Sequence, residues 1–149
     1  LQTVLYYIRM HQNNPLSFLN DLEVPLTLWQ QIYIEDALKH HQGEIPDFSQ
    51  WLEHPQSSVV IFSIKLIADY NQYENIPKLL VFMDKENDFF KIHTLQALSV
   101  LGYDEVINIL ISKFPKENNT IKKEILKFIQ KAGTENHFEK LKKIADIYP

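Results

Sequence analysis

Residues 76–102 read IPKLLVFMDKENDFFKIHTLQALSVLG, and this stretch carries the clearest structural pattern in the chain. Its second half spaces apolar residues in helical steps, as at Leu95 and Leu98, which places them on one face of a helix. The polar residues 84–87 interrupt the apolar pattern, and Gly102 follows the last leucine, where glycine commonly ends a helix. The stretch therefore predicts two helices that form a hairpin.

A shift of 31 residues brings this hairpin onto other parts of the chain. The superimposed positions are apolar in each copy, and they include the sets Ile45, Ile76, Ile107 and Phe138; Phe48, Leu79, Leu110 and Leu141; Ile64, Leu95 and Leu126; and Ile67, Leu98 and Ile129. A fixed period of this length is the sequence signature of a repeat protein. It predicts helical hairpins at residues 46–71, 74–102 and 104–133.

The predicted hairpins end at equivalent residues, Asn71, Gly102 and Gly133. Asparagine and glycine tolerate the left-handed backbone conformation that commonly follows the last turn of a helix. We therefore predict a left-handed residue at each of these three positions.

The ends of the chain fit the period less closely. Residues 1–42 are predicted to form a divergent N-terminal unit, with helices at 16–22 and 25–41 after a helix at 1–12. Residues 135–147 are predicted to form a lysine-rich C-terminal capping helix, because terminal units of a stack have one face without a neighbour. Together the units are expected to make one domain of 149 residues.

The middle hairpin resembles a HEAT repeat of the short type named after phycobilisome lyases. That type pairs two helices around an acidic turn, followed by a basic residue, Ala-Leu and Gly, and the matching residues here are Asp84 or Asp88, Lys91, Ala97, Leu98 and Gly102. The resemblance covers about two-thirds of the chain, and the flanking units keep less of the pattern. It implies an all-α fold, a right-handed α-α superhelix or HEAT-like solenoid of about four hairpins.

Composition narrows the classes of function. The 45% hydrophobic content excludes a disordered chain, and only three glycines leave few turns for an all-β fold. Zero cysteines exclude disulfides and thiolate zinc sites. A net charge of -4 argues against a general phosphate-binding surface, so no nucleic-acid partner is expected.

Charge is nevertheless distributed unevenly. Residues 1–74 carry 3 basic and 9 acidic groups, net -6, whereas residues 75–149 carry 12 and 10, net +2. The lysines of the second half could face an acidic partner or an anionic membrane surface, and the plainer interpretation is a solvated polar face.

The repeated apolar positions are predicted to form the core, together with both tryptophans. The core prediction names Ile64, Leu79, Leu80, Leu95, Leu98, Leu126, Ile129, Trp29 and Trp51. A stack of hairpins explains these positions without a ligand.

If the second helix of each unit lines the concave side, as the resemblance implies, residues beside the core stripe form ladders along that face. The candidate partner-binding residues are Phe62, His93 and Glu124; Lys65, Gln96 and Lys127; Asp69, Val100 and Lys131; and Phe89 at the edge. Their mixture of apolar, amide and charged groups suits an amphipathic peptide or helix.

Catalytic and metal-binding motifs are weak. His40, His41 and His54 are the densest histidine group, but adjacent helical residues point about 100° apart and do not address one ion. His93 beside Glu124 suggests an acid–base pair, although a surface ladder supplies no pocket. We therefore predict no catalytic residues, no metal and no cofactor.

The leading functional prediction is a non-catalytic protein-protein interaction scaffold that binds a peptide or helix on its concave face. One alternative is a membrane-proximal regulatory domain of a larger anchored protein, and another is a lyase or isomerase subunit of the HEAT-like type. The chain starts at Leu1 rather than Met, which indicates a piece of a longer protein with any anchor upstream. The compartment stays unknown. A soluble domain is expected because no apolar run reaches the roughly 20 residues that span a bilayer, with the cytoplasm favoured and a membrane tether in the full-length protein left open.

Overall fold

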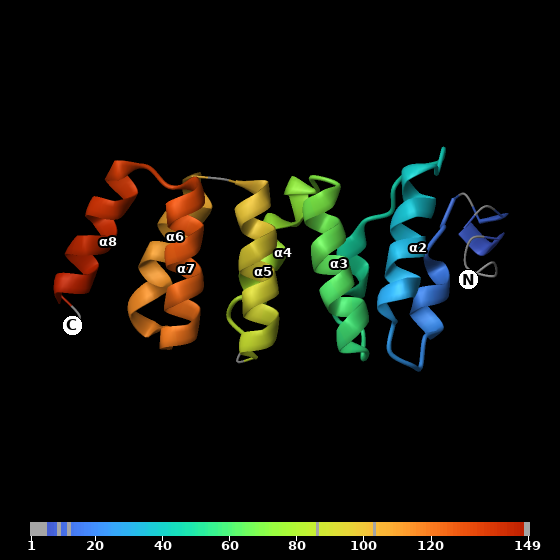
Figure 1. Ribbon diagram of the computed structural model, residues 1–149, viewed down its shortest axis with the longest axis horizontal. Coiled ribbons are helices and arrows are strands. Elements are labelled where there is room, and N and C mark those ends of the chain that lie inside the picture. The colour runs from blue at the N-terminus through green and yellow to red at the C-terminus, as the bar shows by residue number, and fades with distance from the viewer. Residues whose placement is uncertain (1–5, 9, 12, 86, 103, 148–149) are drawn as a thin grey trace. The chain divides into compact units, whose positions relative to one another are not determined.

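The described part of the chain is all-helical. The computed structural model describes residues 6–8, 10–11, 13–85, 87–102 and 104–147 and, for residues 145–147, the backbone only (Figure 1). These residues form α-helices and short 3-10 helices without any β-strand, which confirms the predicted all-α class. Within them, no helix combines the length and the apolar character that crossing a membrane requires.

Backbone contacts divide the chain into two compact units, residues 1–67 and residues 68–149. The expectation of a single domain over all 149 residues stays a prediction. The first unit contains the 3-10 helix η1 (Ser17–Asp21), helix α2 (Leu28–Lys39), the 3-10 helix η2 (Phe48–Trp51) and helix α3 (Ser57–Asp69), which ends two residues past the boundary.

Helix α2 begins with a capping box. The Thr27 hydroxyl accepts a hydrogen bond from the Gln30 backbone N–H at 3.2 Å, and the Gln30 side chain accepts one from the Thr27 N–H at 2.8 Å. Two N–H groups that lack an intrahelical partner are satisfied in this way, which sets the start of the helix.

Side chains about one repeat apart hold the first unit together. The indole N–H of the buried Trp51 donates to Asn20 Oδ1 at 2.7 Å, across a separation of 31 residues. The Leu26 N–H donates to the Ser58 hydroxyl at 2.8 Å, and His54 Nε2 lies 2.7 Å from the Leu19 carbonyl oxygen. These bonds join residues 16–26 to the segment that leads into α3.

Trp29 is a correction to the predicted core. Its side chain is 68% exposed, whereas Ile34 and Leu38 on the same helix are buried. Trp29 and Ile34 are five residues apart, which places them about 140° apart around the helix axis. Only one of those two faces can pack against the rest of the unit.

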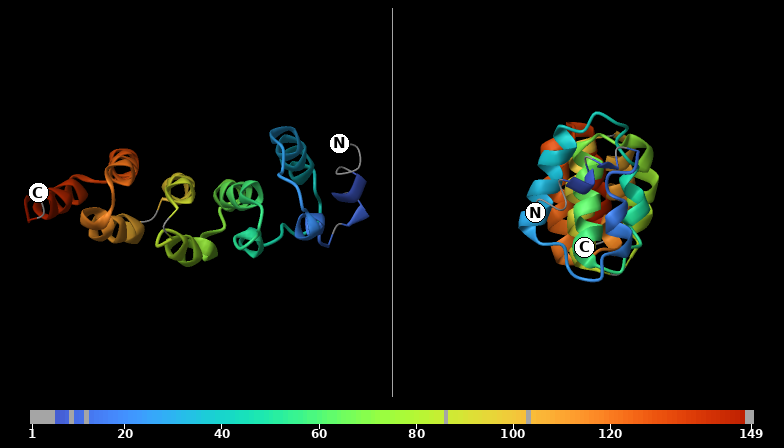
Figure 2. Two further views of the ribbon diagram at one scale, coloured as in Figure 1. Left: turned by 90° about the horizontal axis from the view of Figure 1, so that it is seen from below. Right: turned by 90° about the vertical axis from the view of Figure 1, so that its right-hand side faces the viewer.

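Within its described residues, the second unit contains two helical hairpins and a final helix. Its α-helices are α4 (Ile76–Phe82), α5 (Asp88–Leu101), α6 (Asp104–Lys113), α7 (Asn119–Ala132) and α8 (Glu135–Ile147), with 3-10 helices η3 (Tyr73–Asn75) and η4 (Phe114–Lys116). Helix α4 packs against α5 and α6 against α7; α5 also packs beside α7, and α6 beside α8 (Figures 1 and 2). The two hairpins therefore lie side by side, with their second helices adjacent.

The predicted ranges compare closely with these elements. The ranges 74–102 and 104–133 each contain one hairpin, and 135–147 coincides with α8. In the range 46–71 the first helix is only the four-residue η2, and the predicted helix at 16–22 is the 3-10 helix η1. Of the predicted helix at 1–12, residues 1–5, 9 and 12 lie outside the described part of the chain.

The helix ends show why these elements begin and stop where they do. The side chains of Asn87 and Asn118 accept from the N–H groups of Phe89 and Ile121 at 2.9 and 3.0 Å, which caps α5 and α7. Gly102 ends α5 in the left-handed region, with φ of 56°.

The left-handed prediction is right at Asn71, with φ of 51°, and at Gly102, but it is wrong at Gly133. Gly133 has φ of -83°, which any residue adopts. A Cβ atom at this position would lie 2.5 Å from the carbonyl oxygen of Ile129 and 2.9 Å from its Cγ2 atom. Close approach to the last turn of α7 therefore favours glycine here.

Most predicted core residues are buried, among them Ile64, Leu79, Leu95, Leu98, Ile129 and Trp51. Leu80 is only half-buried, and Leu126 is 36% exposed, which corrects the prediction for both. Leu126 is the repeat equivalent of Leu95, whose helix α5 packs beside α7. Because α8 packs against α6, the corresponding side of α7 is left partly open.

Candidate functional site

A groove of about 230 Å³ lies between α5 and α7 in the second unit. It is lined by Leu95, Gln96 and Ser99 from α5 and by Glu124, Lys127, Phe128 and Lys131 from α7. Both helices contribute lining residues one turn apart, such as Leu95 with Ser99 and Glu124 with Phe128, so each set lies toward one side of its helix.

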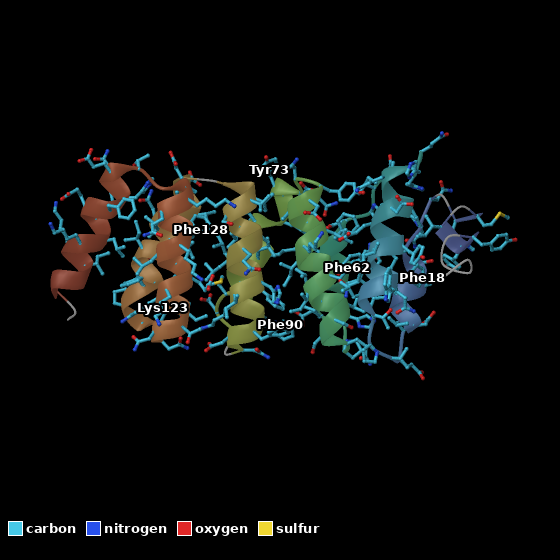
Figure 3. All side chains as sticks on the ribbon, viewed as in Figure 1. Phe18, Phe62, Tyr73, Phe90, Lys123 and Phe128 are labelled. Carbon is cyan, nitrogen blue, oxygen red and sulfur yellow. The ribbon has the colours of Figure 1, made fainter. Side chains whose placement is uncertain are left out.

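The groove has an apolar floor and a polar rim. Leu95 and Phe128 are 2% and 3% exposed, and Figure 3 labels Phe128 on α7. Gln96, Lys127 and Lys131 are exposed at the rim. Such a combination allows an apolar side chain to be covered while polar neighbours set its orientation.

Charge in the groove is only partly compensated. Lys127 Nζ lies 3.0 Å from Glu124 Oε1, with the two side chains 70% and 19% exposed. Lys131 makes no ion pair or hydrogen bond within the described part of the chain. The two lysines and one glutamate leave a net charge of about +1 in the groove at neutral pH.

An ion pair between α5 and the loop before α7 links the two hairpins. Lys91 Nζ on α5 lies 3.1 Å from Glu117 Oε2 in the loop before α7, and the two side chains are only 13% and 12% exposed. Nearby, Asn118 Nδ2 donates to Asp88 Oδ2 at 2.8 Å, and Lys113 pairs with Asp84. These contacts join the α4–α5 turn to the α6–α7 turn and thereby set the spacing of α5 and α7.

Phe89 and His93 lie one turn apart on α5. Their rings meet edge to face, with centroids 4.9 Å apart. Partial burial lowers the pKa of His93 below its ordinary value of 6.5. The imidazole is therefore neutral at neutral pH.

Four of the ten candidate partner-binding residues line this single groove: Gln96, Glu124, Lys127 and Lys131. Phe89, His93 and Val100 share the outer side of α5, where Phe89 and Val100 are 57% and 56% exposed. The suggested acid–base pair is not formed: His93 is outside the groove lining, and among the described residues it makes no hydrogen bond or ion pair with Glu124.

The three candidates on α3 lie elsewhere. Phe62 is a correction, because it is 1% exposed and cannot contact a partner (Figure 3). Helix α3 is buried on most of its sides, as at Val60, Phe62 and Ile64, so the position predicted to face a partner lies in the core. Lys65 Nζ pairs with Glu35 Oε1 at 2.6 Å in the first unit, and Asp69 is exposed at the end of the helix.

Ser99 and Phe128 were not among the predicted site residues. Each lies one helical turn beyond a predicted residue, Gln96 and Glu124 respectively, on the side that faces the neighbouring helix. The sequence signal for them was therefore the helical period itself, applied across two adjacent second helices rather than along one ladder.

Two of the three histidines in the weak metal group, His40 and His54, have local side-chain contacts. His40 Nδ1 lies 2.9 Å from the Asp36 carbonyl oxygen, and His54 Nδ1 accepts from the Gln56 N–H at 3.0 Å. Over the described residues, no three histidine, aspartate or glutamate side chains gather as metal ligands would.

Comparison with known proteins finds one relevant similarity. The chain is 30% identical to human zinc finger protein 277 over 125 residues, which cover 76% of this chain and 24% of that protein. It therefore spans about a quarter of the length of the curated relative. No family profile and no solved structure matches the chain. Because the chain contains no cysteine, the similarity does not bring a cysteine-ligated zinc finger with it.

Proposed function

We propose that this chain is a HEAT-like α-solenoid that acts as a protein-interaction scaffold, and that it binds a peptide or helix in the groove between α5 and α7. The groove carries the proposal, because its buried Leu95 and Phe128 lie beneath an exposed rim of Gln96, Lys127 and Lys131. Peptide-binding surfaces combine an apolar centre with polar edges in this way.

Contacts between neighbouring hairpins support the solenoid part of the proposal. Side chains hydrogen-bond across about one repeat at Asn20 and Trp51, at Asp88 and Asn118, and at Asn108 and Lys140, with separations of 31, 30 and 32 residues. In stacked repeats, each unit contacts its neighbours at equivalent positions. A right-handed superhelix is the arrangement that the HEAT resemblance implies.

The chemistry of the groove favours binding over catalysis. Glu124 is paired with Lys127, and the Ser99 hydroxyl donates to the Gln96 carbonyl oxygen at 2.7 Å, so neither group is set up to transfer a proton. The name of the relative refers to a zinc finger, and this chain lacks the cysteines for one. We therefore retain a non-catalytic scaffold as the proposed function.

The test is a selection from an unbiased display library of helical and extended peptides on the purified chain. Gln96→Trp places an indole over the groove, and Ser112→Trp places one on an exposed position of α6 outside it. We expect the selected peptides to lose binding to the first variant by at least tenfold and to keep binding to the second, since about 1.4 kcal/mol is a factor of ten.

Circular dichroism verifies that both variants keep the helical content of the original chain. Selected peptides that bind the Gln96→Trp variant unchanged would remove the groove from the proposal, as would a library that yields no binder.

A further inference from the structure

Two parallel rows of side chains flank the groove, and they differ in chemistry. Helix α5 carries Phe89, His93, Gln96 and Val100, at steps of four, three and four residues, which form one continuous row. Helix α7 carries Lys123, Lys127 and Lys131 at steps of four, all of them exposed (Figure 3 labels Lys123). We call these the α5 row and the α7 lysine row.

The α5 row is apolar at both ends and carries no charged group. Phe89 and Val100 are 57% and 56% exposed, and eleven residues separate them. At 1.5 Å per residue their Cα atoms are about 16 Å apart along the helix axis, or about three turns. The row therefore offers two exposed apolar side chains at a spacing that a partner helix of similar length can reach.

The α7 lysine row is cationic. Glu124 is the one acidic residue that accompanies it along the groove, and it offsets Lys127 at 3.0 Å. Three lysines and one glutamate leave a net charge of about +2. Lys123 and Lys131 make no ion pair within the described residues, so their ammonium groups are available to a partner.

We propose that the partner of this groove is an acidic amphipathic helix, which packs its apolar face on the α5 row and directs its carboxylates to the α7 lysine row. This proposal rests on the function proposed above and names the chemistry of the partner. Charge complementarity selects an acidic partner, and the apolar row selects one with an apolar face. A phosphate backbone would match the lysines but would leave Phe89 and Val100 uncovered.

The probe is a fluorescein-labelled peptide of 18 residues, helical in solution, with leucines along one face and glutamates beside them. A second peptide replaces each glutamate by lysine. Fluorescence anisotropy with the full chain gives the dissociation constants. We expect the glutamate peptide to bind at least tenfold more tightly than the lysine peptide, and its binding to weaken as salt is raised.

Charge-reversal variants locate the binding. The double variant Lys127→Glu with Lys131→Glu should bind the glutamate peptide at least tenfold more weakly than the original chain does. It should bind the lysine peptide more tightly. The matched control, Lys142→Glu with Lys143→Glu, makes the same change in net charge at exposed positions of α8 and should alter neither constant more than about twofold. Phe89→Ala with Val100→Ala should weaken the glutamate peptide about fivefold, since both side chains are exposed and the fold does not depend on them.

The proposal is overturned if both peptides bind alike, if neither binds at about 100 µM, or if the α8 variant has the same effect as the α7 variant. Tighter binding of a single-stranded oligonucleotide, or of vesicles with anionic lipid, with equal loss in the α7 variant, would assign the lysine row to phosphate instead. The display selection separates this proposal from the one on which it rests. Binders that require the groove but carry no acidic face would leave the scaffold function standing and remove the acidic helix.

Discussion

Two glycines that are 31 residues apart, Gly102 and Gly133, are favoured at their positions for different physical reasons. Gly102 is required by its left-handed backbone, since a Cβ there would meet nothing closer than 3.9 Å. Gly133, one repeat later, has an ordinary φ and is required by contact with Ile129. Equivalent positions thus preserve a residue type without preserving the reason for it.

Gly133→Ala should therefore destabilise the protein more than Gly102→Ala. We expect the free energy of unfolding to fall by about 1 kcal/mol in Gly102→Ala, from the strain of a left-handed alanine. In Gly133→Ala it should fall by about 2–3 kcal/mol, from overpacking against Ile129. Urea unfolding monitored by circular dichroism measures both free energies of unfolding. Equal stability of the two variants would show that the last turn of α7 moves to accommodate a methyl group.

His93 provides a pH-dependent prediction. Its burial lowers its pKa below 6.5, so the folded state disfavours the protonated imidazole. The stability that this contributes is present above pH 6.5 and is lost as the pH falls from 6.5 through the pKa of the folded state. Two-dimensional NMR of the histidine ring protons should show a midpoint below 6.5 for His93.

Phe89→Ala removes the ring that packs on His93 and should raise this midpoint toward 6.5. A midpoint that is unchanged in this variant would assign the burial to other neighbours. A midpoint above 6.5 in the original chain would contradict the predicted direction.

The helices of the second unit are positioned by the turns that connect them. The nearly buried pair of Lys91 and Glu117 and the exposed pair of Lys127 and Glu124 have similar distances, 3.1 and 3.0 Å, but very different surroundings. A buried charge that loses its partner retains its desolvation cost, whereas an exposed one is hydrated. The two pairs therefore contribute unequally to the packing of α5 on α7.

Lys91→Ala should lower the free energy of unfolding by about 3 kcal/mol, because it leaves the Glu117 carboxylate without its partner. Lys127→Ala should lower it by at most about 1 kcal/mol. Chemical denaturation compares the two variants. Replacing both members of the nearly buried pair, as in Lys91→Met with Glu117→Leu, should recover most of the lost free energy of unfolding. Failure to recover it would indicate that the Lys91–Glu117 pair is itself stabilising.

Across the whole molecule, contacts are concentrated in two units with their boundary at residues 67 and 68. Under the proposed solenoid arrangement, stability would be the sum of terms for each repeat and for its interfaces, so local damage need not spread evenly. Trp51 is buried in the first unit and reports on that unit, provided that the exposed Trp29 is first replaced.

In a Trp29→Phe background, Lys91→Ala should shift the unfolding transition seen by circular dichroism more than the transition seen by Trp51 fluorescence. The reason is that Lys91 and its partner belong entirely to the second unit, whereas Trp51 lies in the first. Coincident shifts in both signals would show that the chain unfolds as one cooperative body.

Much of the architecture could be predicted from the helical spacing and the 31-residue period. Helices α4 to α8 lie within the predicted ranges, because their apolar faces, polar turns and capping residues all indicate the same boundaries. The errors occur where packing overrides the period. Phe62 was expected at the surface and is buried, and Trp29 was expected in the core and is exposed. Burial depends on which neighbour covers each side of a helix.

The candidate site was predicted in part. The sequence alone predicted the helical class, which the structure confirms, and it placed Gln96, Lys127 and Lys131 on exposed helix faces, because these follow from local spacing along each helix. Tertiary structure decided that α5 and α7 enclose a groove, that Ser99 and Phe128 line it, and that His93 lies outside its lining. The distance between two helices and the rotation of each about its axis are set by contacts such as Lys91 with Glu117, which join residues far apart in the chain.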